Sequence, residues 1–154
     1  MSKRILIVHT SWYEEYISEM LNISKEILED FDCTTAVAPG ALELAALAAY
    51  KILHNEESVY QDRLPFTSAE EISSNDFIGV LFLGIIIKGE TSHYDLITKE
   101  AFRSINSLAI EHIGLSFINN VICVENKEQL EPRLVRNTTN NTKALIQLIN
   151  EKSS

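Results

Sequence analysis

The sequence predicts an α/β fold: a three-layer α/β/α sandwich whose middle layer is a four-stranded, mostly parallel sheet. Two observations predict it. Short apolar runs typical of strands alternate with segments whose apolar residues recur every three or four positions, as on one face of a helix. The most apolar segment, residues 77–87, has the unbroken hydrophobicity of a strand covered on both faces, which places it at the centre of the sheet.

The first half of the chain supplies two predicted strands and two predicted helices. Residues 4–9 form a short apolar run. From Tyr13 the apolar residues fall three and four positions apart, which gives one helical stripe. Residues 33–38 form a second strand that a Pro-Gly pair ends. The alanine- and leucine-rich residues 41–53 are predicted as a helix packed closely on a neighbour.

The segment between this helix and the central strand has no clear period. Residues 55–76 are rich in Glu, Ser and Asp and contain Pro65. We expect an insertion at the surface of a single domain that spans residues 1–154, because nothing else in the chain indicates a linker or a repeat.

The second half of the chain carries two helix-start signals. Ser92, with an aspartate three residues later, has the spacing of a capping box, and residues 115–124 form the last strand. Asn126, with a glutamine three residues later, marks a further helix start. Pro132 is expected to shorten that helix, so a separate last helix covers about residues 142–151.

Composition excludes several classes of protein. The formal net charge of −9 argues against general attraction to nucleic acid or to an anionic membrane. No apolar run is long enough to cross a bilayer, and the first one is too brief for a signal peptide, so we expect a cytoplasmic protein. Cys33 and Cys123 lie in strand-like runs without metal-ligand spacing; we expect small buried hydrophobes there and no metal site.

The predicted topology indicates where a ligand binds. In open parallel sheets, ligands bind outside the carboxyl ends of the strands. The candidate segments are therefore those that follow the four strands: residues 9–12, 39–43, 88–93 and 119–133.

The turn after the central strand is a candidate anion site. Gly89 to His93 opens a helix, where backbone N–H groups and the helix dipole attract a phosphate, and Thr91 can add a hydroxyl donor. The dipole also disfavours a charged His93, which would leave it neutral and able to act as a general base. An ordinary turn with a capping serine and a structural histidine is the alternative interpretation.

Three further side chains are candidates, each with a simpler alternative. Arg133 can hold a phosphate with its planar fork, or can be a surface cation beside Glu131. Trp12 can stack on a planar ring, or can pack in a core or an interface. Glu43 can accept hydrogen bonds from sugar hydroxyls, or can be a carboxylate favoured at a helix start.

Together these segments resemble the lumazine synthase family over nearly the whole chain and in the right order. Ala38-Pro-Gly-Ala-Leu-Glu43 looks like the family's Val-Pro-Gly-Ala-aromatic-Glu segment. Leu83-Gly-Ile-Ile-Ile-Lys-Gly-Glu-Thr-Ser-His-Tyr-Asp95 is similar to its strand, phosphate turn and catalytic histidine. Glu128-Gln-Leu-Glu-Pro-Arg133 resembles its arginine-bearing helix, and His9-Thr-Ser-Trp12 the strand end where many members have Ala-Arg-Phe/Trp.

The resemblance implies a set of roles. His93 would move protons, and no metal or redox cofactor would be needed. The implied substrate-binding residues are Trp12, Ala41, Leu42, Glu43, Ile86, Ile87 and Asn119, and the implied phosphate-binding residues are Gly89, Glu90, Thr91 and Arg133. It further implies a flavodoxin-like fold and a homopentamer, sometimes built into a larger shell, with active sites between neighbouring subunits.

The chain departs from the family's pattern around the ring and the sugar chain. Ser11 replaces the usual arginine, and Tyr13 the usual asparagine. The aromatic residue of the fourth strand falls at Asn119, with Phe117 two residues away on the same strand face. The region after the arginine, usually glycine-rich with a lysine, is here residues 137–143; Lys143 corresponds to that lysine only with a shift, because ungapped alignment places Asn141 there.

The resemblance implies that the protein condenses 5-amino-6-(D-ribitylamino)uracil with 3,4-dihydroxy-2-butanone 4-phosphate to give 6,7-dimethyl-8-ribityllumazine in riboflavin biosynthesis. The departures leave a second hypothesis open, a catalytically weak protein that binds lumazine or flavin on the same scaffold. A signalling or electron-transfer domain of flavodoxin-like shape would need an acidic cluster or a phosphate loop after the first strand. His9-Thr-Ser-Trp12 supplies neither.

Overall fold

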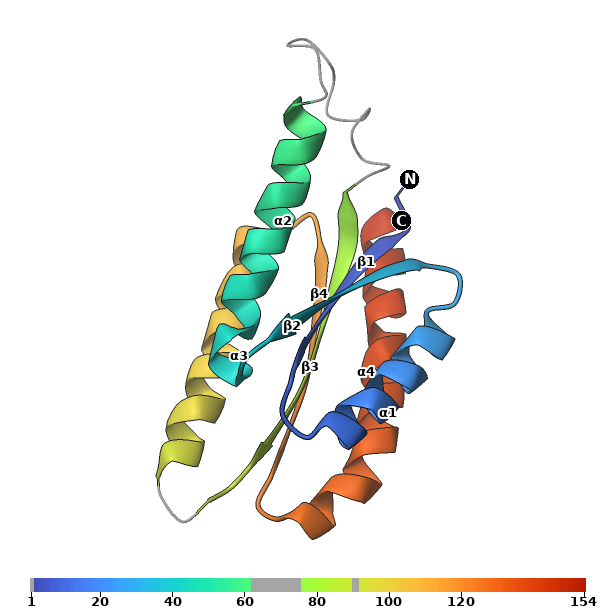
Figure 1. Cartoon of the computed structure of the whole chain (residues 1–154). Coiled ribbons are helices and arrows are strands. Elements are labelled where there is room, and N and C mark those ends of the chain that lie inside the picture. The colour runs from blue at the N-terminus through green and yellow to red at the C-terminus, as the bar shows by residue number, and fades with distance from the viewer. Residues whose placement is uncertain (1, 62–75, 90–91) are drawn as a thin grey trace.

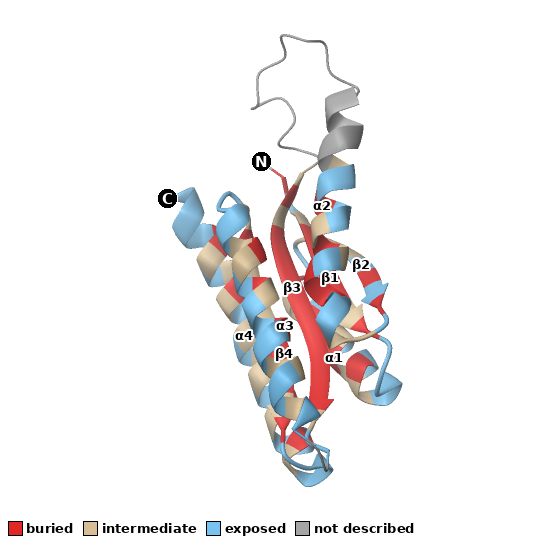
Figure 2. Ribbon diagram, turned by 90° about the vertical axis from the view of Figure 1, so that its left-hand side faces the viewer, coloured by how far each residue is buried: buried red, intermediate tan, exposed pale blue. Residues whose placement is uncertain are grey.

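A computed structural model of the chain describes residues 2–61, 76–89 and 92–154. Its sheet contains four strands, all parallel, in the order β2-β1-β3-β4. Their bounds are β1 Arg4–Thr10, β2 Asp32–Ala38, β3 Phe77–Ile87 and β4 Ser116–Val124. The fold class is confirmed, and β3 lies inside the sheet and is buried along nearly its whole length (Figure 2).

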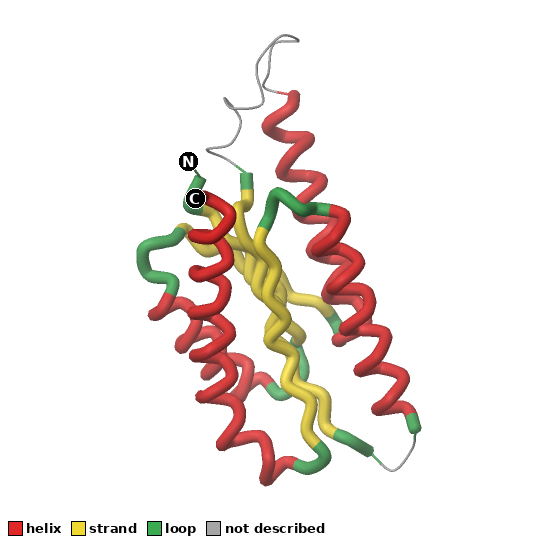
Figure 3. Tube along the Cα trace, turned by 180° about the vertical axis from the view of Figure 1, so that it is seen from behind, coloured by secondary structure: helices red, strands yellow, loops and turns green. Residues whose placement is uncertain are grey.

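Helices cover both faces of the sheet, which gives three layers (Figure 1). The helices α2 (Leu44–Gln61) and α3 (His93–Glu111) lie on one face. The other face carries α1 (Glu14–Ile27) and α4 (Leu130–Ser153). Seen from behind, the two ends of the chain lie close together at one end of the sheet (Figure 3).

Side chains alternate between the two faces along the inner strands, so each face of the sheet has its own hydrophobic core. In β1, Leu6 and Val8 point toward α2 and α3, while Ile5 and Ile7 point toward α1 and α4, and all four are fully buried. This is the period of two that an extended chain imposes. A strand inside a doubly covered sheet is therefore apolar at every position, as the sequence predicted for β3.

The helix start predicted at Ser92 was confirmed, since Ser92 is the N-cap of α3, although its side chain makes no capping hydrogen bond. Two predicted helix extents were wrong. Pro132 lies in the first turn of a single 24-residue α4, where a missing N–H costs no helical hydrogen bond; the predicted separate last helix is part of it. The helix predicted to end at residue 53 continues to Gln61 as α2, so the surface insertion is not irregular from residue 55; residues 62–75 lie outside the described residues.

Other signals were confirmed. The Asn126 side chain accepts a hydrogen bond from the Gln129 N–H, and the Gln129 side chain accepts one from the Glu125 N–H. These contacts satisfy N–H groups that have no helical partner where the short helix η3 (Lys127–Gln129) begins. In the part of the chain that the structure describes, no helix is long and apolar enough to cross a membrane.

Candidate functional site

A pocket of about 490 Å³ lies beyond the carboxyl ends of β1, β2 and β3, on the face covered by α2 and α3. Three separate segments meet there, because parallel strands deliver the residues that follow them to the same edge of the sheet. The described residues that line it are Thr10, Trp12, Tyr13, Pro39, Gly40, Ala41, Leu42, Glu43, Ile85, Ile86, Ile87, His93 and Ile97.

The side wall of the pocket is the indole of Trp12. Its Nε1–H donates to the Pro39 carbonyl oxygen at 2.8 Å, which ties the loop after β1 to the turn after β2. Trp12 remains 66% exposed, so most of its surface is not used for packing within the chain. An indole fixed at one edge and open elsewhere suits stacking on a planar ligand.

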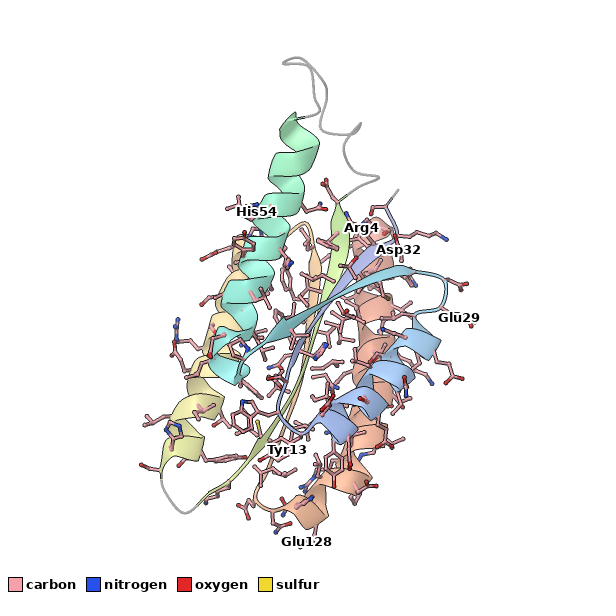
Figure 4. The ribbon with its side chains drawn as sticks, viewed as in Figure 1. Arg4, Tyr13, Glu29, Asp32, His54 and Glu128 are labelled. Carbon is pink, nitrogen blue, oxygen red and sulfur yellow. The ribbon has the colours of Figure 1, made fainter. Side chains whose placement is uncertain are left out.

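Tyr13, next to it, holds a left-handed backbone conformation, with φ 57° and ψ 52°, at the start of α1. Figure 4 shows it at the end of the sheet where the pocket lies, with Arg4 and His54 at the opposite end. The left-handed region costs a bulky residue free energy, whereas asparagine adopts it readily. The asparagine that the resemblance expects here would fit this backbone with less strain.

The turn after β2 provides the second wall. Pro39 and Gly40 end the strand, and Ala41–Glu43 forms the 3-10 helix η1. The Glu43 side chain is exposed and lies at the pocket beside Leu42. The carboxylate can therefore accept hydrogen bonds from a ligand without leaving solvent.

His93 is the first residue of α3 and is exposed at the pocket. It also borders a second hollow of about 430 Å³, whose other lining residues are Leu42, Leu96, Ile97, Lys99 and Glu100. Gly89 is exposed in the turn before α3, and an added Cβ there would meet nothing within 4 Å. Glu90 and Thr91, the other residues of the predicted phosphate turn, lie outside the described residues.

Five described residues that were predicted for the site do not line this pocket: Gly89, Phe117, Asn119, Arg133 and Lys143. Phe117 packs in the core on Phe82, with ring centroids 6.4 Å apart, and the Asn119 side chain accepts a hydrogen bond from the Val121 N–H at 2.9 Å. Their strand β4 is at the sheet edge, and β3 separates it from β1 and β2.

Arg133 and Lys143 are on α4, which covers the opposite face of the sheet. The described residues that line the pocket therefore include no arginine or lysine.

Asn141, at the position where the family resemblance expects a lysine, also points away from the pocket. Its side-chain N–H donates to the side-chain amide oxygen (Oδ1) of Asn120 at 2.8 Å, between α4 and β4. Residues 137–143, where the chain departs from the family's pattern, therefore form continuous helix that packs on the sheet.

The described residues offer neither a reactive thiolate near neutral pH nor a cluster of metal ligands. Burial raises the pKa of the Cys123 thiol to about 11 and also raises the pKa of Cys33, so both thiols are protonated near neutral pH. Among the described residues, no group of three or more His, Cys, Asp or Glu side chains is placed to hold a metal ion.

Sequence reasoning missed several residues of the pocket. Thr10, Pro39 and Gly40 fell in the segments that follow strands but were given no role. Ile85 and Ile97 were outside those segments, and only the packing of α3 on the strand ends brings them in. The signal for Thr10 was its position at the end of an otherwise apolar strand face.

The fold and this pocket define an α/β domain that presents a small-molecule site at the carboxyl edge of its sheet. The profile of a family described as "6,7-dimethyl-8-ribityllumazine synthase" matches residues 2–152. The chain belongs to this enzyme family.

Relatives of the same description span most of the chain. The 6,7-dimethyl-8-ribityllumazine synthase of Agrobacterium fabrum is 30% identical over 139 residues, which cover 88% of this chain and 83% of the relative. The 6,7-dimethyl-8-ribityllumazine synthase 1 of Rhizobium meliloti is 31% identical over 134 residues, 86% of this chain and 77% of the relative. That of Neisseria meningitidis serogroup C is 26% identical over 152 residues, 96% and 83% of the two chains.

Proposed function

We propose that the protein condenses 5-amino-6-(D-ribitylamino)uracil with 3,4-dihydroxy-2-butanone 4-phosphate to give 6,7-dimethyl-8-ribityllumazine. Beyond family membership, one observation carries the proposal: Trp12, Glu43 and His93, from three different segments, line the same pocket. This condensation needs three groups from a protein: an aromatic ring that stacks on the pyrimidine, a carboxylate that accepts hydrogen bonds from hydroxyl groups, and a side chain that transfers protons.

The reaction requires positioning more than activation. The primary amine of the pyrimidine attacks the ketone and loses water to give an imine, phosphate is eliminated, and the second ring closes with loss of another water. Trp12 stacks on the pyrimidine ring. The ring and the ribityl chain are held by Ala41, Leu42 and Glu43. The polar edge of the ring forms hydrogen bonds with the backbone of Ile86 and Ile87. His93 moves protons between successive steps while the site keeps the reactants together.

The phosphate side of the site needs a second copy of the chain. In this proposal Gly89, Glu90 and Thr91 form the phosphate turn, and Arg133 of a neighbouring subunit supplies the cation, because a single chain places Arg133 behind the sheet. Asn119 reaches the ring from the same neighbour, with Phe117 and Lys143 as weaker candidates.

Exposed apolar side chains on α2 and α3 support association with neighbouring subunits. They are Tyr50, Leu53, Leu96, Phe102 and Ile110, from 38% to 74% exposed. We propose a homopentamer. Light scattering should report an oligomer, and a stable 17.4 kDa monomer would contradict the shared site.

The test is to mix the purified protein with both substrates and follow lumazine absorbance. His93→Ala should lower turnover by about 100-fold, the lower end of the range for loss of an acid/base group, while leaving substrate affinity nearly intact. His112→Gln, a half-buried histidine away from the pocket, is the control. An unchanged rate in His93→Ala would remove His93 from the mechanism.

The second candidate is a protein that binds lumazine or flavin with little catalysis. Asn119 favours it, because this amide bonds to its own strand and offers a ligand no aromatic face. The same assay separates the candidates: bound fluorescent ligand without turnover indicates the binding protein.

A further inference from the structure

Thr10 ends a row of side chains that is otherwise entirely apolar. Leu6, Val8 and Thr10 point to the same face of β1, and the first two are fully buried in the core beneath α2. Thr10 is 2% exposed and lines the floor of the pocket, where that core ends. The first polar group in the row therefore appears where a ligand would begin.

The hydroxyl of Thr10 has no hydrogen-bond partner among the residues that the structure describes. Its methyl group faces Gly84 of β3: a Cβ added to that glycine would lie 3.6 Å from the Thr10 Cγ2. Valine would fill this space equally well. An unsatisfied buried hydroxyl costs stability, and such groups are rare in native proteins, so threonine at this position needs a reason other than packing.

The surroundings of Thr10 indicate which kind of ligand group could form a hydrogen bond with its hydroxyl. The β3 side of the pocket is formed by Ile85, Ile86 and Ile87, and the Trp12 indole forms a wall whose face suits a planar ring. A flat heterocycle that stacks on Trp12 and enters between these walls would bring its leading edge to the floor. A threonine hydroxyl can donate and accept, so it suits a carbonyl or a ring N–H on that edge.

We infer that the Thr10 hydroxyl turns toward the pocket and hydrogen-bonds a carbonyl or ring N–H of the heterocycle, beside the groups that the backbone of Ile86 and Ile87 contacts, and so strengthens ligand binding. The inference rests on the proposed function, since it takes the ribitylamino-pyrimidine and the lumazine as the ligands. Thr10 holds the ring and takes no part in proton transfer. In the free protein its unsatisfied hydroxyl lowers stability, and in the complex it strengthens binding.

Two substitutions separate binding from packing. Thr10→Val keeps the shape and removes the hydroxyl, whereas Thr10→Ser keeps the hydroxyl and removes the methyl. The probe is 6,7-dimethyl-8-ribityllumazine, titrated by fluorescence, together with the thermal midpoint of each ligand-free protein. Thr35→Val, an exposed threonine on β2, is the matched control and should change neither quantity.

For Thr10→Val we expect the Kd to rise by about 10-fold to 100-fold, as when a buried hydrogen bond to a ligand is lost, with an unchanged or higher midpoint. For Thr10→Ser we expect a lower midpoint from the lost methyl and a Kd within about threefold of the wild type. A side chain that only packs cannot give this opposite pattern.

Three results would overturn the inference. Wild-type affinity in Thr10→Val would remove the hydroxyl from recognition and leave the proposed function standing. A lower midpoint with an unchanged Kd in Thr10→Val would assign the hydroxyl to the fold. A wild-type protein that neither binds the lumazine nor forms it would sink the proposed function and this inference together.

Discussion

A buried amide network joins α4 to the sheet, and Asn120 is its centre. The Asn120 side-chain N–H donates to the Thr138 hydroxyl oxygen at 2.9 Å, and its carbonyl oxygen accepts from Asn141 at 2.8 Å. Asn120 is 1% exposed and Thr138 fully buried. We predict that Asn120→Ala destabilises the protein strongly, because it leaves the Thr138 hydroxyl in the core without this partner.

The magnitude follows from the burial of the two partners. A fully buried hydroxyl that loses its partner costs about 1–3 kcal/mol. Asn141 is half-exposed and can turn to water, so its lost bond adds about 0.5–1.5 kcal/mol. Together these losses lower the free energy of unfolding by about 1.5–4.5 kcal/mol, which lowers Tm by about 3–18 °C in a protein of this size.

The assay is urea and thermal unfolding at one fixed protein concentration, since association raises apparent stability. Asn119→Ala is the matched control, because among the described residues that neighbouring amide accepts a hydrogen bond from the Val121 N–H alone, and its loss should cost less than about 1 kcal/mol. Thr138→Val completes a double-mutant cycle, and the double variant should cost less than the sum of the singles by about 1 kcal/mol. Equal losses in Asn119→Ala and Asn120→Ala, or strict additivity, would refute the reasoning.

Three further predictions concern packing, backbone strain and pH. Gly79→Ala should lower the free energy of unfolding by about 1–3 kcal/mol, because its Cβ would lie 3.2 Å from two methyl groups of α4. Gly114→Ala, with open space around it, is the control and should be neutral or stabilising by about 0.4–1 kcal/mol. Equal effects of the two substitutions in urea unfolding would contradict the packing argument. Tyr13→Asn should raise the free energy of unfolding by about 1 kcal/mol by relieving the left-handed backbone, and a loss of stability would show that the ring's contacts outweigh the strain. Burial raises the pKa of the Cys123 thiol from its ordinary 9.0 to about 11, so the contribution of this thiol to stability is complete below pH 9 and is lost as pH rises through 11. In unfolding experiments across that range, Cys123→Ala should lack this loss of stability. An identical pH profile in the variant and the wild type would refute the prediction.

The sequence by itself determined the strands and the face that each residue occupies. The bounds predicted for β3 match the structure, because a strand buried on both faces is apolar from end to end and needs no knowledge of its neighbours. The edge of the sheet that carries the pocket was predicted for the same reason: strands joined by helices run parallel, so the segments after them meet at one edge. The start of η3 at Asn126 was also local, since a cap depends on residues three positions apart.

Only the tertiary structure decided which of the candidates meet within one chain. His93 and Trp12 line one pocket, whereas Asn119 and Arg133 do not, because β3 separates β4 from β1 and β2 and α4 packs on the other face. The burial of Thr10 without a partner was likewise invisible in the sequence, where a threonine at the end of a strand is ordinary. Periodicity specifies the direction of a side chain within its own element. Strand order and helix packing, which depend on the whole chain, decide what that side chain faces.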